Sequence, residues 1–467
     1  MPGEVLFKPV LAGSILLLSL EVTSLERLYT AVARLEKELA VSAILLQDIA
    51  SRFQEAMSEG LAGRSSSLKM LPSFIGSPTG QEQGQVIAVD FGGTNVRVLL
   101  VELAGTGRSR IAARRTFPLK DKLGYYDYTA VSASGPELFD FIAGKISEIV
   151  SDGGIYPLGY TFSFPCRQQG VDKAVLINWT KEIKTVGVEG RDVGQMLQAA
   201  LENRGLERVR LQAVINDTTG TLLTGAYSDP ATTIGAICGT GHNTCYLESC
   251  QPVTKRPMIV NMESGNFDGV QQTKYDILLD QASEKPGAQR LEKMVSGQYL
   301  GELVRLIVGS LAADGHISSG SERLSVPYSL PTEDISAILG DTSPELEAVV
   351  AVAAARWGIT GLKVSEYKAI QTIARLVAMR SARLVTATWA GVLSKIDPGF
   401  VRQHTIAVDG ALYEKMPGYA EQLANTMVEM FGDKAKKITI RLSKDGSGIG
   451  AAIAAATVYK GKYCNER

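Results

Sequence analysis

Two stretches of the chain carry apolar runs on either side of a glycine-rich turn. In residues 86–103 (VIAVDFGGTNVRVLLVEL) an apolar run ends at Asp90, and beyond the glycines apolar and polar positions partly alternate. Residues 232–248 (TTIGAICGTGHNTCYLE) have the same form. Each pattern predicts two strands joined by a tight turn. Because Gly93 and Gly241 stand 148 positions apart, we infer an internal duplication of one α/β unit.

Helical periodicity is clearest in residues 23–60 and 361–396. In the first range Thr23 and Glu26 form a capping-box pattern, and the apolar stripe resumes after Ser42. This stripe is formed by Leu25, Leu28, Tyr29, Val32, Leu35, Leu45, Ile49, Phe53 and Met57. In the second range Ile370, Ile373, Leu376 and Val377 form the apolar face, and Pro398 is expected to end the helix.

The apolar segment Leu11–Val22 is the one candidate for targeting or membrane insertion. It has twelve residues and carries Glu21, whereas a bilayer span needs about 20 apolar residues. A secretory signal would also need a basic leader, and Lys8 stands alone. We therefore expect a buried helix or strand here and no membrane span.

Composition narrows the class of protein further. The chain has 467 residues, 45% of them hydrophobic, and a formal net charge of −1, so it lacks a broad electrostatic footprint for nucleic acid. Five cysteines in a chain of this length do not make a disulfide framework, and three scattered histidines do not favour a zinc site. These features predict reduced thiols and a cytoplasmic location.

The two turns are candidates for binding phosphate. Gly92 and Gly93 leave the backbone open to phosphate oxygens, with Thr94 and Asn95 as further donors. A Walker loop or a dinucleotide fingerprint would instead need a strand followed by a helix. A plain tight hairpin explains one such turn equally well. Two of them in duplicated halves favour the phosphate interpretation.

One acid is placed for proton transfer. Residues 211–223 (LQAVINDTTGTLL) predict a buried strand that ends at Asn216-Asp217 and turns into a helix. In open α/β sheets ligands collect at the carboxyl ends of strands, where Asp217 could accept a proton from a substrate hydroxyl. An N-cap for the following helix is an equally natural role for Asp217.

Several polar positions could hold a polyhydroxylated ligand. Ser163, Thr180 and Lys181 offer donors, and Lys181 could also meet developing phosphoryl charge. Carboxylates accept hydrogen bonds from adjacent hydroxyls. Each of these residues could equally lie on a solvated face. The acidic and amide candidates are Glu263, Gln289 and Glu292.

Two Asp-Gly pairs follow strand-like runs near the C-terminus. The first is Asp409-Gly410, and the second lies within residues 438–459, where Gly446–Gly450 lead into an alanine-rich helix expected from Gly450. Glycines at a helix N-terminus suit an anion or a nucleotide. A plain strand-to-helix turn would have the same sequence.

Taken together, these segments resemble the hexokinase family of sugar kinases, in the actin-like ATPase fold. The motifs that carry the resemblance are TFSFPC, NWTK, IND, GTGHN, NME and LEKMVSGQYLGELVR, in this order between Leu71 and about Tyr459. The resemblance implies an α/β fold of two duplicated actin-like (ribonuclease H-like) lobes, each with a mixed sheet, separated by a sugar and nucleotide cleft. The implied halves are residues 23–228 and 229–460.

The resemblance also implies roles. Asp217 would be the general base that acts on the sugar 6-hydroxyl, with Lys181 assisting, and the γ-phosphoryl group of Mg-ATP would pass to a hexose, glucose above mannose or fructose. Sugar hydroxyls would be held by Ser163, Thr180, Lys181, Asn216, Asp217, Asn243, Glu263, Gln289 and Glu292. Asp90 would lie near Mg²⁺. Nucleotide contacts would come from Asp90, Gly92, Gly93, Thr94, Asn95, Arg97, Gly239, Thr240, Gly241, Asp409, Gly410, Gly446, Ser447 and Gly448.

Alternatives on the same fold are a non-catalytic sugar sensor, a kinase for another substrate, and an actin-like assembly ATPase. The intact Asp217 and GTG motif disfavour the first, and the sugar carboxylates disfavour the last. Four positions depart from the family pattern: His242, Ser264, Glu182-Ile183 and Ile449. They bear on which hexose and which phosphoryl donor are used. A monomer or a homodimer is expected.

Overall fold

The computed structural model describes residues 8–151, 154–180, 183–249, 255–318 and 322–464. The chain divides into two compact units, which are described separately. Unit 1 comprises Met1–Ile49, Asp268–Ala387 and Lys415–Thr426, and unit 2 comprises Ala50–Phe267, Thr388–Glu414 and Met427–Arg467. Both large sheets belong to unit 2.

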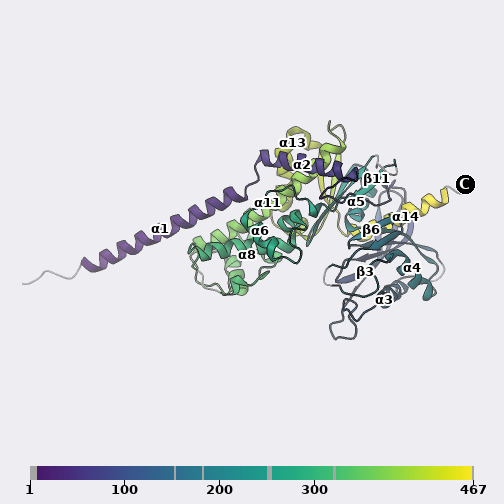
Figure 1. Cartoon of the computed structure of the whole chain (residues 1–467), viewed down its shortest axis with the longest axis horizontal. Coiled ribbons are helices and arrows are strands. Elements are labelled where there is room, and N and C mark those ends of the chain that lie inside the picture. The colour runs from purple at the N-terminus through teal and green to yellow at the C-terminus, as the bar shows by residue number, and fades with distance from the viewer. Residues whose placement is uncertain (1–7, 152–153, 181–182, 250–254, 319–321, 465–467) are drawn as a thin grey trace, which may run out of the picture. The chain divides into compact units, whose positions relative to one another are not determined.

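Helices make up the regular structure of unit 1 (Figure 1). The longest are α1 and α11, and α11 continues beyond Ala387 into unit 2. The helices are α1 (Lys8–Leu39), α6 (Lys274–Ala282), α7 (Arg290–Val295), α8 (Gly297–Ala313), α9 (Thr332–Gly340), α10 (Glu347–Val352) and α11 (Val364–Ile396), with the short helical turns Glu322–Ser325 and Ala353–Trp357. Like α11, the helices α2 (Ala43–Leu61), α12 (Ala411–Lys415) and α13 (Tyr419–Phe431) are divided between the units.

The N-terminal helix was predicted only in part. It begins at Lys8, so Thr23 lies inside α1 and the predicted capping box is wrong. Leu28 and Leu35 are buried as expected, whereas Leu25 and Tyr29 are 38% and 57% exposed. The single helix predicted over residues 23–60 is also wrong, because the structure has a break at residues 40–42 between α1 and α2 (Ala43–Leu61). The Ser42 side chain accepts a hydrogen bond from the Leu45 N–H at the start of α2.

Unit 2 contains two mixed sheets with one repeated topology. The first has the order β4-β3-β2-β5-β8 and the second the order β1-β11-β10-β9-β12-β13. In each, an antiparallel hairpin (β2 with β3, β9 with β10) continues into two parallel strands. Both predicted hairpins are confirmed, and so is the α/β fold with two mixed sheets. The repeat agrees with the inferred duplication.

The strands have the following bounds: β1 (Leu71–Pro72), β2 (Gln83–Phe91), β3 (Asn95–Ala104), β4 (Ser109–Pro118), β5 (Tyr156–Phe162), β8 (Val209–Ile215), β9 (Thr232–Cys238), β10 (His242–Glu248), β11 (Met258–Asn261), β12 (His404–Asp409) and β13 (Ile438–Leu442). A separate small hairpin pairs β6 (Cys166–Gly170) with β7 (Lys173–Leu176). The helices of unit 2 are α3 (Gly135–Ser147), α4 (Val193–Asn203), α5 (Asp217–Ser228) and α14 (Gly446–Cys464), with the helical turns Ser264–Asn266 and Gly432–Lys437.

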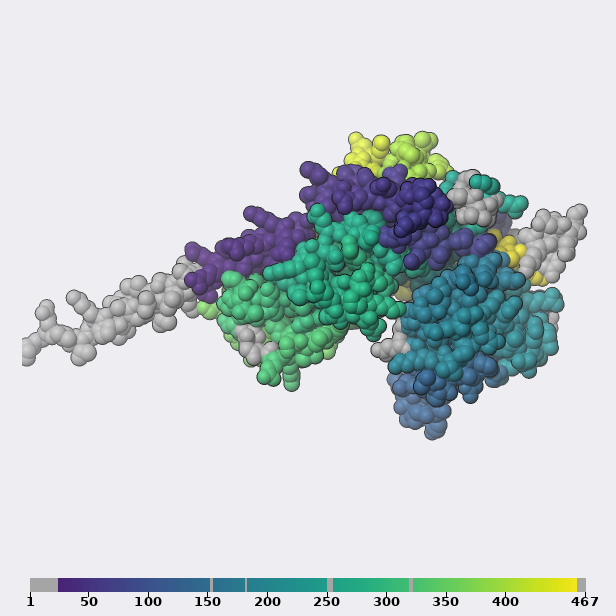
Figure 2. Space-filling model, in the orientation of Figure 1, coloured from purple at the N-terminus to yellow at the C-terminus, as the bar shows by residue number. Residues whose placement is uncertain are grey.

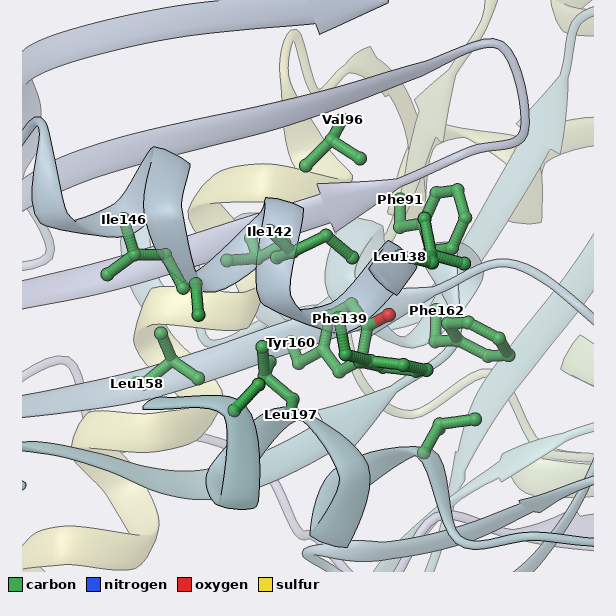
Figure 3. Close-up of a cluster of buried hydrophobic side chains, with 14 of the residues drawn as sticks. Phe91, Val96, Leu138, Phe139, Ile142, Ile146, Leu158, Tyr160, Phe162 and Leu197 are labelled. Carbon is green, nitrogen blue, oxygen red and sulfur yellow. The ribbon is translucent and has the colours of Figure 1, made fainter. Parts of the chain in front are cut away.

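A hydrophobic core lies between the first sheet and the helices α3 and α4. Figure 3 shows Phe139 and Ile142 of α3 and Leu197 of α4 over Leu158 and Tyr160 of β5. The outer surface of this part of unit 2 is blue to teal in Figure 2. Burial of these side chains accounts for the apolar runs seen in the sequence.

A second core joins the sheets to α5 and α14. Here α14 packs so closely on β5 that a Cβ atom on Gly159 would lie 1.8 Å from the Ala451 carbonyl oxygen. A glycine is therefore required at position 159. This packing fixes the N-terminus of α14 beside the carboxyl ends of β2 and β5, where polar residues collect.

Candidate active site

The first glycine turn follows a buried carboxylate. Asp90 stands near the end of β2 and is 6% exposed. Its Oδ2 accepts hydrogen bonds from Arg97 Nη1 and from Ser447 Oγ, each at 3.1 Å. Burial raises the pKa of Asp90, and the Arg97 guanidinium opposes that shift. Gly92 has open space where a Cβ atom would stand, so the predicted access to the backbone is present.

The second turn lies against a separate Asp-Gly pair. Gly239 donates its N–H to the Gly241 carbonyl oxygen at 3.1 Å, which closes the turn through Thr240. Gly410 has φ +123°, and a Cβ atom on it would lie 2.4 Å from the Cys238 carbonyl oxygen. The fold therefore brings Gly410 against the GTG turn, and the sequence predicted both segments only separately.

Asp217 is the first residue of α5, and Asn216 alone separates it from the strand β8. The N-cap of this helix is Asn216, whose Oδ1 accepts from the Thr218 N–H at 2.9 Å. The alternative that Asp217 is the N-cap is therefore wrong. Its carboxylate also accepts from the Thr218 N–H, at 2.7 Å, and the side chain is half-buried.

Three other carboxylates lie close enough to Asp217 to sense its charge. Burial is the main cause that raises the pKa of Asp90, of Glu263 and of Asp409, and the Asp217 charge adds to each rise. For Asp409 the pKa rises to about 6, although the N–H groups of Gly446 and Gly410 oppose the shift. Asp217 is thus close enough to interact electrostatically with Asp90 beside the first turn, with Asp409 and with Glu263. Several acids with perturbed pKa values close together are typical of catalytic sites.

Glu263 is held by an amide network. Its Oε1 accepts from Asn261 Nδ2 at 2.8 Å and from Asn243 Nδ2 at 3.5 Å. Its backbone has φ +53°, a left-handed conformation that a non-glycine residue rarely adopts without a functional or structural reason. A small cavity of about 40 Å³ lies beside it, lined by Asn216, Thr219 and Asn261 among others. These groups present hydrogen-bond acceptors and donors at one place.

The glycine segment near the C-terminus completes the group. The helix α14 begins at Gly446, four residues earlier than the sequence predicted. The Gly446 N–H donates to Asp409 Oδ2 at 3.0 Å. Thr161 Oγ1 donates to the Ser447 carbonyl oxygen at 2.8 Å, and Thr224 Oγ1 donates to that of Gly446, also at 2.8 Å. The N-terminus of α14 and both glycine turns are therefore linked through Asp90 and Asp409.

Comparison with known proteins decides the family. Two models that describe hexokinases match residues 31–227 and 233–457. Hexokinase-7 of Oryza sativa subsp. japonica is 38% identical over 453 residues, covering 91% of this chain and 96% of the relative. Hexokinase-1 of Schizosaccharomyces pombe is 34% identical, covering 92% and 90%. The chain belongs to the hexokinase family.

Solved hexokinases share the fold. A crystal structure of a hexokinase matches with a TM-score of 0.84 and 33% identity, covering 93% of this chain and 100% of the other. A hexokinase from Schistosoma mansoni, complexed with glucose, matches with a TM-score of 0.80 and 34% identity, covering 93% and 99%. The expected actin-like two-lobe fold is thereby confirmed.

The remaining sugar candidates of this hexokinase fall into three groups. Ser163 and Thr180 lie in unit 2, and the Ser163 N–H donates to the Phe91 carbonyl oxygen at 3.2 Å, next to the first turn. Lys181 lies outside the described residues. Gln289 and Glu292 belong to unit 1, where Gln289 Nε2 donates to Glu292 Oε1 at 3.2 Å and Gln289 has φ +53°.

The departures from the family pattern are mostly buried. His242 is 4% exposed, and burial lowers its pKa to about 4, so the imidazole is neutral near pH 7. Ser264 and Ile183 are also buried, and Ile449 packs against the core that α14 shares with the sheets. Glu182 lies outside the described residues.

Sequence reasoning missed Thr161, Thr224 and Arg114, which all contact the segment around the N-terminus of α14. No local pattern marks these residues, because each partner lies more than 200 positions away.

No helix among the described residues is both long and apolar enough to cross a bilayer.

Proposed function

We propose that this hexokinase transfers the γ-phosphoryl group of ATP to the 6-hydroxyl group of a hexose, glucose first among them, to give hexose 6-phosphate and ADP. The observation that carries the proposal is the position of Asp217, at a strand end and within electrostatic reach of Asp90, Glu263 and Asp409. A general base placed between phosphate-binding turns and sugar-binding acceptors suits transfer to a hydroxyl.

In the proposed mechanism Asp217 takes the proton of the 6-hydroxyl group as the sugar 6-oxygen attacks the γ-phosphorus. The bond from the γ-phosphorus to the β,γ-bridging oxygen breaks, and that oxygen leaves as part of ADP. The hydrogen bond from the Thr218 N–H holds the carboxylate in one orientation. Little covalent help is needed for phosphoryl transfer, so catalysis consists mainly of positioning and of charge stabilisation. Lys181 is proposed to assist as a cation near the transferred group.

The sugar is proposed to lie against Glu263. Its carboxylate, pre-oriented by Asn261 and Asn243, can accept hydrogen bonds from two adjacent hydroxyls. Ser163, Thr180 and Asn216 of unit 2 would supply other contacts. The contacts expected from Gln289 and Glu292 stay predictions. Glucose in the similar Schistosoma mansoni structure supports glucose as the first substrate to test.

The residues present fit a magnesium nucleotide. Mg²⁺ typically binds one or two carboxylates and otherwise water and phosphate oxygens. Asp90 is a buried carboxylate near the end of β2, beside a glycine turn. Asp90 would therefore hold the ion, which would neutralise phosphate charge. The turns at Gly92-Gly93 and Gly239–Gly241, with Gly410 and Gly446–Gly448, would hold ATP.

The proposal is tested by a coupled assay of the purified protein with a panel of hexoses and phosphoryl donors. We expect ATP-dependent formation of glucose 6-phosphate, with mannose and fructose as slower substrates. Binding of glucose without any turnover would instead support the sugar-sensing alternative. The cytoplasmic location and the monomeric or dimeric state remain predictions.

A further inference from the structure

An ion pair joins the edge of the first sheet to the residue before α14. Arg114 Nη2 of β4 lies 2.6 Å from Asp445 Oδ2, across 331 positions of the sequence. Both residues belong to unit 2. Asp445 directly precedes Gly446, where α14 begins. The pair therefore acts on the segment that contacts both Asp409 and Asp90.

Asp445 has an unusual backbone. Its φ is +56°, in the left-handed region that side chains other than glycine rarely adopt. The next two residues depend on this turn, because the Gly446 N–H reaches Asp409 at 3.0 Å and the Ser447 hydroxyl reaches Asp90 at 3.1 Å. A change of conformation at Asp445 would redirect both donors.

The sheet register places Arg114 on the face that meets α14. Arg114 is paired with Leu99 across the antiparallel ladder, and Arg97 is paired with Thr116. Leu99 packs toward Gly448, since a Cβ atom on that glycine would lie 3.1 Å from Leu99 Cδ1. Alternate residues of a strand share a face, so Arg115 lies on the opposite face from Arg114. Arg115 is thus a natural control.

We infer that Arg114 is a positioning residue for the phosphoryl donor: by holding Asp445 in the left-handed conformation, it presents the N-terminus of α14 to the phosphates. This inference rests on the proposed function. The side chains of Arg114 and Asp445 are 41% and 29% exposed, and an ion pair so accessible to water adds little to stability. Its loss should therefore appear in donor binding and leave thermal stability nearly unchanged.

The test compares Arg114→Met with Arg115→Met in steady-state kinetics. For Arg114→Met we expect the KM for ATP to rise about three- to tenfold, with kcat and the KM for glucose nearly unchanged. Arg115→Met should match the wild type. Arg114→Lys keeps the charge and should recover most of the affinity for ATP.

A double variant distinguishes two roles of Arg114: positioning Asp445 and contacting the phosphoryl donor directly. Glycine adopts the left-handed conformation without strain, so Arg114→Met combined with Asp445→Gly should return the KM for ATP to near the wild-type value. A KM that stays raised in the double variant would mean that Arg114 touches the donor itself, and would overturn the inference. Identical kinetics of Arg114→Met and Arg115→Met would also overturn it, while leaving the proposed function intact. A wild type without ATP-dependent turnover would remove the proposed function itself.

Discussion

The Ser447 hydroxyl donates a hydrogen bond to the Asp90 carboxylate, with Oγ 3.1 Å from Oδ2, although the two residues stand 357 positions apart. Asp90 lies near the end of β2, beside the first glycine turn, and Ser447 lies at the N-terminus of α14. This contact makes one site of two segments that are unrelated in sequence. Phosphate groups placed there would meet backbone N–H groups from both.

Gly92→Ala tests whether the first turn binds phosphate or is only a tight hairpin. Open space surrounds the position of the added Cβ atom, so the protein should fold with nearly unchanged stability. A phosphate group, however, could no longer approach the backbone closely, and the KM for ATP should rise about tenfold. Thermal melts and initial rates at varied ATP measure the two effects. An unchanged KM would favour the plain hairpin.

Glu263→Gln tests the sugar contact. The amide keeps the shape of the side chain but loses the charge that strengthens hydrogen bonds from sugar hydroxyls. We expect the KM for glucose to rise about 10- to 100-fold, with a smaller change in the KM for ATP. Glu207→Gln, at an exposed position of the same unit, is the matched control and should be silent. Equal kinetics of the two variants would exclude Glu263 from the sugar site.

Asp409→Asn should make stability less dependent on pH. Burial raises the pKa of Asp409 to about 6, above its usual value of 3.8, so the folded state binds more protons than the unfolded state between these values. This acid therefore lowers the stability of the wild type as pH rises from about 4 to about 6. The variant should be more stable than the wild type by about 1–3 kcal/mol at pH 8, and the difference should vanish near pH 4.

Urea unfolding at pH 4, 6 and 8 measures that difference. A constant difference across this range would contradict the assignment, since a neutral asparagine would then be replacing an acid whose pKa is the same in both states.

Gly159→Ala tests the packing of α14 on β5. The added Cβ atom would overlap the Ala451 carbonyl oxygen, so α14 would have to shift, at a cost of more than about 3 kcal/mol of unfolding free energy. Gly309→Ala is the control: it lies within α8, and its nearest neighbour to the added atom is 4.0 Å away. That variant should gain about 0.5–1 kcal/mol. Similar melting temperatures for the two variants would contradict the described packing.

The sequence predicted what depends on local pattern. Both hairpins and the strand before Asn216 could be inferred because hydrophobic period and glycine turns act over a few positions. The break between α1 and α2 was missed, because the apolar stripe continues on both sides of Ser42. The predicted start of α1 at Thr23 was wrong. The helix begins at Lys8, and the residues before Thr23 contain no signal that would exclude a helix. The start of α14 was set four residues too late for a similar reason: glycines are poor helix formers, and contacts with α5 outweigh that preference.

The sequence predicted which residues belong to the candidate site, but not how these residues are arranged relative to one another. Asp217, Asp90 and Asp409 were named from their positions after strands, but their mutual influence on pKa requires the folded chain. The positive φ values at Glu263 and Gln289 were not foreseeable, because both residue types normally avoid that conformation. The link from Arg114 to Asp445 joins the strand β4 to the turn before α14, 331 positions away, and leaves no local signal.

The most direct measurement is the turnover of Asp217→Ala and of the isosteric Asp217→Asn in the coupled glucose and ATP assay, with glucose binding followed by calorimetry. Loss of the general base should lower kcat by about 10²- to 10⁴-fold in both variants, while glucose still binds. Turnover equal to that of the wild type, in folded protein, would contradict the assignment of Asp217 as the catalytic base.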